Sequence, residues 1–106
     1  MFGRQVTLKL KANSATELNR ISADEILPIL RKQKGFRDET TFVAPERSEA
    51  IVNSLWDTKA DAEAYGHTAY AEVLKTLSNV IDGTPTVKNF EFASSTFQQA
   101  AAWKLV

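Results

Sequence analysis

The sequence has no cysteine among its 106 residues and a single histidine, His67. The absence of cysteine excludes disulfide bonds, thiolate catalysis and thiolate metal sites. One histidine and no ordered spacing of carboxylates leave no credible set of metal ligands, so we expect no metal. The sequence also lacks a Gly-rich phosphate loop and a G-x-S-x-G element, which argues against a nucleotide site or a serine hydrolase. We expect no cofactor.

An excess of charge is absent too, because 13 basic residues balance 13 acidic ones. Nothing in this balance calls for nucleic acid or an anionic membrane as a partner. No apolar run reaches membrane-spanning length, and residues 1–5 lack the apolar stretch of a signal peptide. We therefore expect a cytoplasmic protein. The length predicts one domain, residues 1–106, whose modest core would gain from an additional interface.

Alternating apolar and polar residues predict strands. The clearest alternation runs from Val6 to Lys11 and places a strand at about residues 5–12. Further strands are expected at 36–43, 49–56 and 87–93, with a turn at 45–48 that pairs the second and third as a hairpin. The third is apolar on both faces, so we expect it to be a central strand. In the second, Phe36 and Phe42 are expected to share one face.

Two stretches have helical periodicity. The first begins at a capping box of Ser14 and Glu17 and ends at Gly35, with a kink near residues 24–27 ahead of Pro28. The second opens with a cap at Thr58, breaks near residue 66, and continues as an apolar stripe over 70–81 that ends at Gly83.

The resulting order, β-α-β-β-α-β, predicts an α+β fold of the ferredoxin-like class. In this fold a four-stranded antiparallel sheet carries its helices on one face and leaves the other face bare. We expect a second copy of the chain to cover that face, as a homodimer. Residues 97–106 form an apolar C-terminal arm with Phe97 and Trp103. Our hypothesis is that this arm packs across the dimer.

Three segments, residues 30–36, 54–57 and 62–65 (LRKQKGF, SLWD and AEAY), carry a resemblance to a known family. They resemble the antibiotic biosynthesis monooxygenase-like family of dimeric α/β barrels. The resemblance implies a homodimer in which two sheets face one another as a closed barrel, with a pocket in each subunit. This superfamily includes cofactor-free quinone-forming oxygenases and haem-degrading enzymes.

The sequence departs from the haem-degrading relatives at three positions. Those relatives use an Asn on the first strand, a Trp in the helix after the third strand and a His further along. Here the first strand has no Asn between Val6 and Lys11, the helical aromatic residue is Tyr65, and Lys75 stands at the later position. Haem degradation is therefore disfavoured.

His67 is the candidate general base, with Tyr65 and Tyr70 close to it in sequence. A cofactor-free oxygenase needs a base that deprotonates a phenol or enol, because the resulting anion can react with dioxygen. The alternative is a surface or helix-capping histidine. Trp56 and Tyr70 are candidates to line an aromatic pocket, and the alternative for Trp56 is a plain core position.

Asn53 is expected to be a buried amide that needs a partner. It could bond Asn89 of the fourth strand, or it could orient a ligand carbonyl; Asn89 is itself a candidate ligand-binding residue.

Two functions follow from these patterns. The first is a homodimeric barrel that binds a small apolar or aromatic compound and, if catalytic, acts as a cofactor-independent monooxygenase. The second is a non-enzymatic barrel for ligand binding, sensing or assembly. Polar side chains converging on an empty volume would favour the first, and a volume filled by side chains would favour the second.

Overall fold

The computed structural model describes residues 1–44, 46 and 48–93. Pro45 and Arg47 of the predicted turn and the predicted C-terminal arm, 97–106, lie outside the described residues. The elements follow one another in the order β1 (Phe2–Leu10), α1 (Ala15–Ile21), a π-helical segment η1 (Ser22–Ile26), α2 (Leu27–Arg31), β2 (Phe36–Ala44), β3 (Glu49–Trp56), α3 (Lys59–His67), α4 (Tyr70–Leu77) and β4 (Ile81–Glu91).

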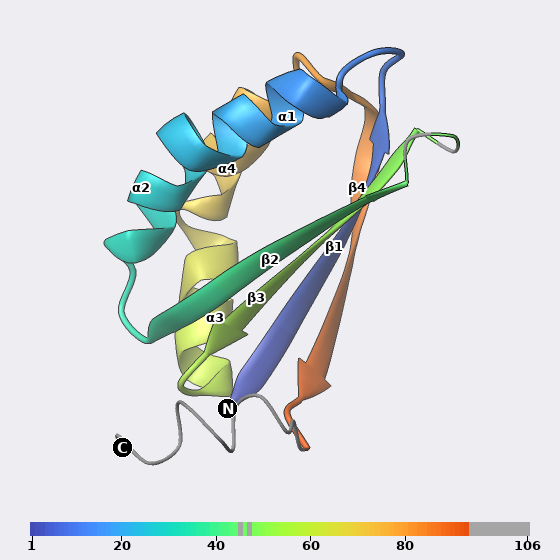
Figure 1. Cartoon of the computed structure of the whole chain (residues 1–106). Helices are drawn as coiled ribbons and strands as arrows, with labels where there is room; N and C mark the ends of the chain where they lie inside the picture. Colours follow the sequence, from blue (N-terminus) through green and yellow to red (C-terminus); the bar gives the residue numbers. More distant parts are fainter. Residues whose placement is uncertain (45, 47, 94–106) are drawn as a thin grey trace.

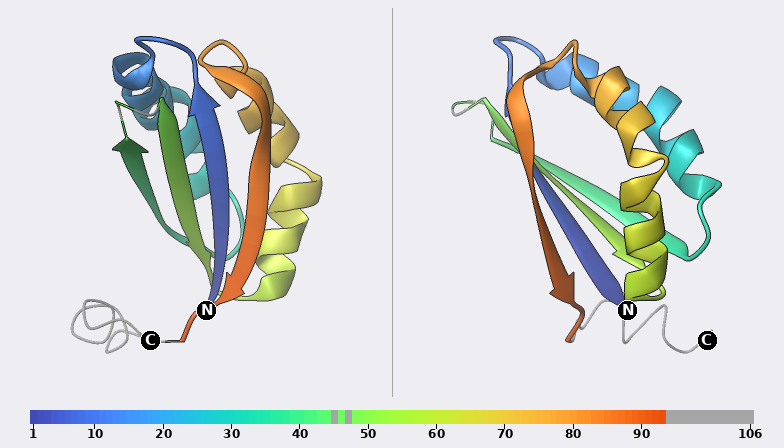
Figure 2. Two further views of the ribbon diagram at one scale, coloured as in Figure 1. Left: turned by 90° about the vertical axis from the view of Figure 1, so that its right-hand side faces the viewer. Right: turned by 180° about the vertical axis from the view of Figure 1, so that it is seen from behind.

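The four strands form one antiparallel sheet in the order β2-β3-β1-β4. Within residues 1–44, 46 and 48–93, all helices lie on the same face of this sheet and none covers the opposite face (Figures 1 and 2). The ferredoxin-like fold, the β2–β3 hairpin and the central position of β3 are therefore confirmed. In the part of the chain that the structure describes, no helix has the length and apolar character needed to cross a membrane.

The core lies between the sheet and the helices. Alternate residues of β1 point into it, among them Leu8, which is 0% exposed. The helical layer contributes buried aliphatic side chains from both halves of the chain. Because these side chains occupy helical spacing in α1, α2 and α4, each helix turns one apolar face to the sheet. The largest fully buried side chains are Trp56, Leu8 and Leu18.

The first helical stretch is interrupted where Pro28 predicts it. In η1 the Leu27 amide donates to the Ser22 carbonyl, which is the i to i+5 bond of a π-helix. Pro28 has no amide hydrogen to donate to the carbonyl of Asp24, so the regular α-helical ladder cannot pass this point. The predicted capping box is wrong, because Ser14 makes no side-chain cap bond, whereas Thr58 accepts from the Asp61 amide at 3.1 Å as predicted.

The predicted end of the last helix is wrong. α4 stops at Leu77, and Ile81 already belongs to β4, where it pairs with Leu10. The Lys11 amide donates to the Val80 carbonyl at 2.9 Å, so pairing with β1 captures this segment before another helical turn forms. Gly83, with φ of 71°, lies inside β4 near a register irregularity and is not a helix cap.

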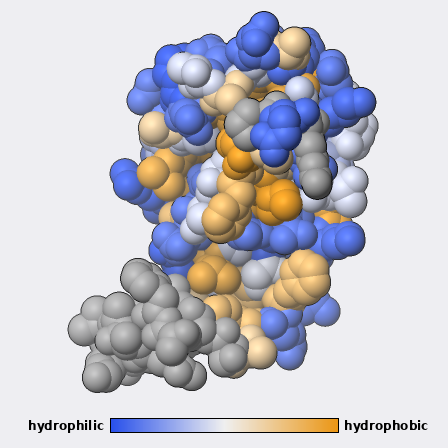
Figure 3. Space-filling model, turned by 45° about the vertical axis from the view of Figure 1, so that its right-hand side comes forward, coloured by the Kyte–Doolittle hydropathy of each residue, from blue (hydrophilic) through white to orange (hydrophobic). Residues whose placement is uncertain are grey.

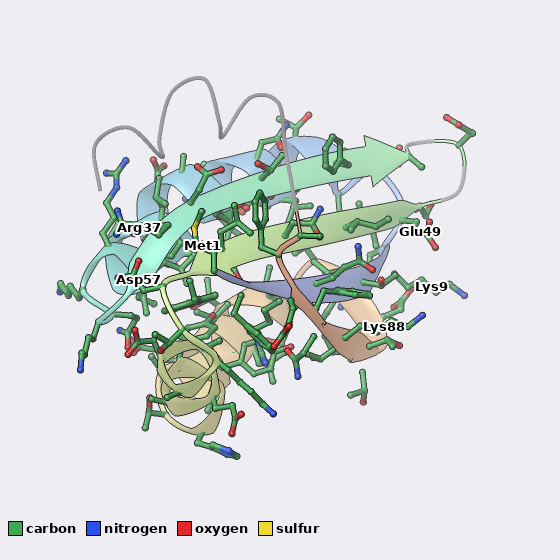
Figure 4. The ribbon with its side chains drawn as sticks, turned by 90° about the horizontal axis from the view of Figure 1, so that it is seen from below. Met1, Lys9, Arg37, Glu49, Asp57 and Lys88 are labelled. Atoms are coloured by element: carbon green, nitrogen blue, oxygen red, sulfur yellow. The ribbon has the colours of Figure 1, made fainter. Side chains whose placement is uncertain are left out.

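β2 contains a bulge at its start. Phe36 pairs with Trp56 and Asp38 with Leu55, so Arg37 is the extra residue. The bulge turns Phe36 toward the helices, where it meets Trp56 edge-on at 5.5 Å, and leaves Phe42 on the other face. The expectation that the two phenylalanines share a face is therefore wrong. Arg37 forms an ion pair with Asp57 at this corner (Figure 4).

Candidate functional site

A cavity of about 30 Å³ lies between the sheet and the helices. Most of its wall is apolar and comes from Val and Leu residues of β1, β3 and α4 and from the α1–η1–α2 layer, which includes Ser22. Besides Ser22, the polar residues that line the cavity are Arg4, Glu39, Ser54, Tyr65 and Tyr70. A volume of this size holds one or two waters, so a larger ligand must displace lining side chains.

Three of the polar residues form one row across the helix-facing side of the sheet. In the strand register Ser54 of β3 lies between Glu39 of β2 and Arg4 of β1. In the next row on the same face Val6 pairs with Val52, and Thr41 of β2 is the neighbour of Val52. The Arg4–Ser54–Glu39 row thus places two charged side chains beneath the helices, and burying charged groups costs stability unless they find partners.

Arg4 is 8% exposed and makes no ion pair among the described residues. Its buried Nε has no hydrogen-bond partner. The guanidinium carbon lies 4.3 Å from the centre of the Tyr70 ring and 5.6 Å from that of Tyr65, in cation–π contact. Gly66 makes room for it, because a Cβ there would stand 3.1 Å from Nη1.

An aromatic cluster of Trp56, Tyr65 and Tyr70 packs next to Arg4. Trp56, fully buried, stacks on Tyr65 with ring centres 5.0 Å apart, and Tyr65 meets Tyr70 at 5.8 Å. The Trp56 indole donates to the Ser54 hydroxyl at 2.9 Å, and that hydroxyl lies 3.4 Å from the Arg4 carbonyl. Trp56 does not border the cavity itself. It contacts Ser54 and Tyr65, which do, and these contacts orient both side chains.

Burial raises the pKa of both tyrosines above the ordinary value, and the positive charge of Arg4 offsets only part of this rise. Both phenols are therefore protonated at neutral pH. Tyr65 and Tyr70 can donate hydrogen bonds to a ligand oxygen, but they are poor general bases at this pH.

Glu39 supplies the only carboxylate that borders the cavity in the described part of the chain. Its side chain is partly buried, and its Oε1 accepts from the Thr41 hydroxyl at 2.6 Å. Its negative charge contributes to the raised pKa of Tyr65. Glu39 is thus held at the polar end of the cavity with its second oxygen available.

The structure brings only some of the predicted site residues together. Tyr65 and Tyr70 border the cavity, with Trp56 behind them. His67 is exposed at the last position of α3 and does not border it.

The two asparagines also lie away from the cavity. Asn53 points to the open face and accepts from Gln5 Nε2 at 3.2 Å, while Asn89 is exposed on β4. The predicted Asn53–Asn89 bond is wrong, because β1 runs between β3 and β4 and the two residues take opposite faces.

Sequence reasoning missed Arg4, Ser54 and Glu39. A signal for the first two exists, since Arg4 stands two residues before the inward-facing Val6, and Ser54 two residues before Trp56. Glu39 has no such signal because the bulge in β2 changes the alternation. Among residues 1–44, 46 and 48–93, no three His, Asp or Glu residues gather where they could hold a metal ion.

The sequence matches no family profile and no curated protein. The fold, in contrast, matches many solved structures. One is a monooxygenase from the gene ActVA-Orf6 of Streptomyces coelicolor, in complex with nanaomycin D; its TM-score is 0.75 at 16% identity, over 89% of this chain and 88% of that one. This chain has the fold of that monooxygenase.

Two further structures agree. The NE2512 protein of Nitrosomonas europaea, of unknown function, has a TM-score of 0.72 at 16% identity, over 90% of this chain and 91% of its own. A Bordetella bronchiseptica protein provisionally assigned as an antibiotic biosynthesis monooxygenase has a TM-score of 0.73 at 10% identity, over 88% and 97%. The resemblance predicted from the sequence is confirmed at the level of the fold. At these sequence identities a shared fold does not establish a shared activity.

Proposed function

We propose that this protein binds a small aromatic compound with an acidic hydroxyl, a phenol or an enol, in the cavity between sheet and helices. The observation that carries the proposal is the buried guanidinium of Arg4, which has neither an ion pair nor a partner for Nε. A buried charge without a counter-ion is costly, and a bound phenolate or enolate would supply one. The apolar wall suits the hydrocarbon part of such a ligand.

The reaction that fits such a ligand is cofactor-independent oxidation. Arg4 stabilises the anion, Tyr65 and Tyr70 donate to its oxygens, and the apolar wall limits access of water. The anion supplies the electrons: dioxygen adds to a ring carbon, and loss of one water leaves a quinone. One phenol and one dioxygen thus give one quinone and one water. The structural similarity to the Streptomyces coelicolor monooxygenase supports this class.

The second candidate is a non-enzymatic barrel, and the small cavity favours it. At about 30 Å³ the space is almost filled by its own side chains. Ligand entry therefore requires Arg4 or the tyrosine rings to move. The guanidinium packs on both tyrosine rings, so ligand entry would shift Arg4 and these rings together.

Calorimetry with 2-naphthol and naphthalene tests the binding proposal. We expect 2-naphthol to bind at least about tenfold more tightly, since only it offers an oxygen to Arg4. Bound 2-naphthol should also ionise at a lower pH than free 2-naphthol, as followed by the absorbance of the anion. Arg4→Met should abolish both effects, and His67→Ala should change neither. Equal affinity for the two compounds would refute the proposal, and oxygen uptake separates an enzyme from a binding protein.

We also propose that the open face of the sheet binds a second copy of the chain. Phe42 and Phe90 on this face are 57% and 50% exposed, and apolar side chains gather on it between polar ones (Figure 3). They flank a groove of about 380 Å³ that also contains Leu55 and the Gln5–Asn53 pair. A face of this kind is typical of an interface, and two-fold symmetry would cover it on both copies. The packing of residues 97–106 across this dimer stays a prediction.

A further inference from the structure

We propose that Glu39 selects the ligand by a second hydroxyl group, so that the preferred compound is a dihydroxylated aromatic with one oxygen at Arg4 and one at Glu39. This inference rests on the proposed function and adds a residue that determines specificity. Two opposite charges, those of Glu39 and Arg4, border one cavity without forming an ion pair with each other.

The strand register sets the separation of the two charges. Glu39 and Arg4 lie on β2 and β1, and β3 runs between them with Ser54 at the shared row. Two interstrand spacings place their Cα atoms about 9–10 Å apart. Both side chains reach the same cavity from these positions, so a ligand between them meets a cation at one end and an anion at the other.

Ser54 is not suited to bind the second hydroxyl of the ligand. Its hydroxyl already accepts from the Trp56 indole and lies next to the Arg4 carbonyl. Asn89, in the same row on the other side of Arg4, is exposed and does not border the cavity. Glu39 is therefore the residue that can accept a hydrogen bond from a second ligand hydroxyl, while Arg4 binds the first oxygen.

The surroundings of Glu39 favour a hydrogen bond from a ligand hydroxyl. The Thr41 hydroxyl donates to Oε1 at 2.6 Å and fixes the side chain. No hydrogen bond to Oε2 is present in the described part of the chain, and a carboxylate has acceptor capacity for several donors. A hydrogen bond to a charged acceptor that is partly shielded from water discriminates strongly against a ligand that lacks the donor.

The test compares two ligands on two proteins. 2-Naphthol has one hydroxyl, and 2,7-dihydroxynaphthalene has a second one on the same side of the rings. We expect the wild-type protein to prefer the diol roughly tenfold, and Glu39→Leu to reduce that preference to about unity while the affinity for 2-naphthol stays within twofold. Arg4→Met should weaken both ligands. Glu72→Leu, which removes an exposed carboxylate from α4, is the matched control and should leave both affinities unchanged.

Each outcome decides between the ideas. If Glu39→Leu weakens both ligands equally, or weakens neither, Glu39 does not read the second hydroxyl and this inference is wrong, while binding through Arg4 stands. If the wild-type protein binds neither compound, the proposed function itself fails. Glu39→Gln, which keeps the shape and a neutral acceptor, should give an intermediate preference. It serves as the test variant if Glu39→Leu does not fold, as checked by its thermal melt.

Discussion

The two faces of this one sheet are built by the same four strands and have different tasks. Alternate residues of β1 show the contrast: Leu8 is fully buried beneath the helices, and its neighbour Lys9 is exposed (Figure 4). On the covered face the helices supply the apolar partner that the strands need. On the open face the same need is unmet, with Phe42 and Phe90 left at the surface.

The covered face also contains its own contrast. Val6 and Val52 form a plain apolar pair, whereas the Arg4–Ser54–Glu39 row places charges where apolar side chains would stabilise the fold better. Most covered positions are therefore explained by the stability of the fold alone. The charged row and the exposed phenylalanines are not, and they are the features on which the proposed ligand site and the proposed dimer depend.

The largest expected effect tests the covered face. Leu8→Ala should lower the free energy of unfolding by about 2–5 kcal/mol, because it leaves a cavity in a core position with no exposure. Lys9→Ala, one residue away on the other face, should cost less than about 0.5 kcal/mol. Urea melts of both variants measure this. Similar losses would mean that the two faces of β1 do not differ in the way described.

The open face is tested by charge. Phe42→Asp puts a carboxylate in the centre of the proposed interface and should weaken the dimer by about 2 kcal/mol, or roughly 30-fold in Kd. Phe42→Leu, which keeps an apolar side chain, should weaken it less. Light scattering across a dilution series gives the dissociation constants. A wild-type protein that is monomeric at micromolar concentration would remove the basis for this comparison.

The polar row and its aromatic neighbours predict a pH dependence. Tyr65 and Tyr70 have pKa values above the ordinary value in the folded state, so the unfolded chain ionises first as pH rises past about 10. The unfolded state then binds fewer protons, so stability falls as pH rises above about 10, by at most about 1.4 kcal/mol per pH unit for Tyr65 and by less for the more exposed Tyr70, with no effect at neutral pH. Tyr65→Phe should reduce this slope relative to the wild-type protein. Urea melts between pH 9 and about pH 11 measure the difference, and parallel curves would show that Tyr65 is not buried as described.

Periodicity predicted the fold well because burial sets it. The central position of β3, the break ahead of Pro28 and the Thr58 cap all follow from local residue patterns. Events that depend on strand pairing could not be predicted in this way. The bulge at Arg37 and the early end of α4 arise where pairing with β3 and β1 overrides the local pattern.

The site was only partly predictable for the same reason. Tyr65 and Tyr70 were predicted because they are close in sequence to His67, and the helical segments that contain them place both at the cavity. Arg4, Ser54 and Glu39 are far apart in the chain and meet only through strand register. His67 was a candidate because it is the one histidine of the sequence. The number of histidines does not determine which side of a helix a residue occupies, and His67 is exposed.

The smallest expected effect concerns the space around the Arg4 guanidinium. Gly66 lies in α3, where alanine is intrinsically preferred by no more than about 1 kcal/mol. A Cβ at this position would stand 3.1 Å from Nη1, so the guanidinium must shift by a few tenths of an ångström. Gly66→Ala should therefore leave the melting temperature equal or slightly higher and weaken 2-naphthol about threefold, because a small displacement costs a charged contact part of its strength. Ala64→Gly, on the exposed side of the same helix, is the matched control: it should lower stability without changing affinity. Calorimetry and thermal melts on the two variants measure both quantities, and a Gly66→Ala protein that binds 2-naphthol as tightly as the wild-type protein would show that the position of Arg4 against α3 does not matter for binding.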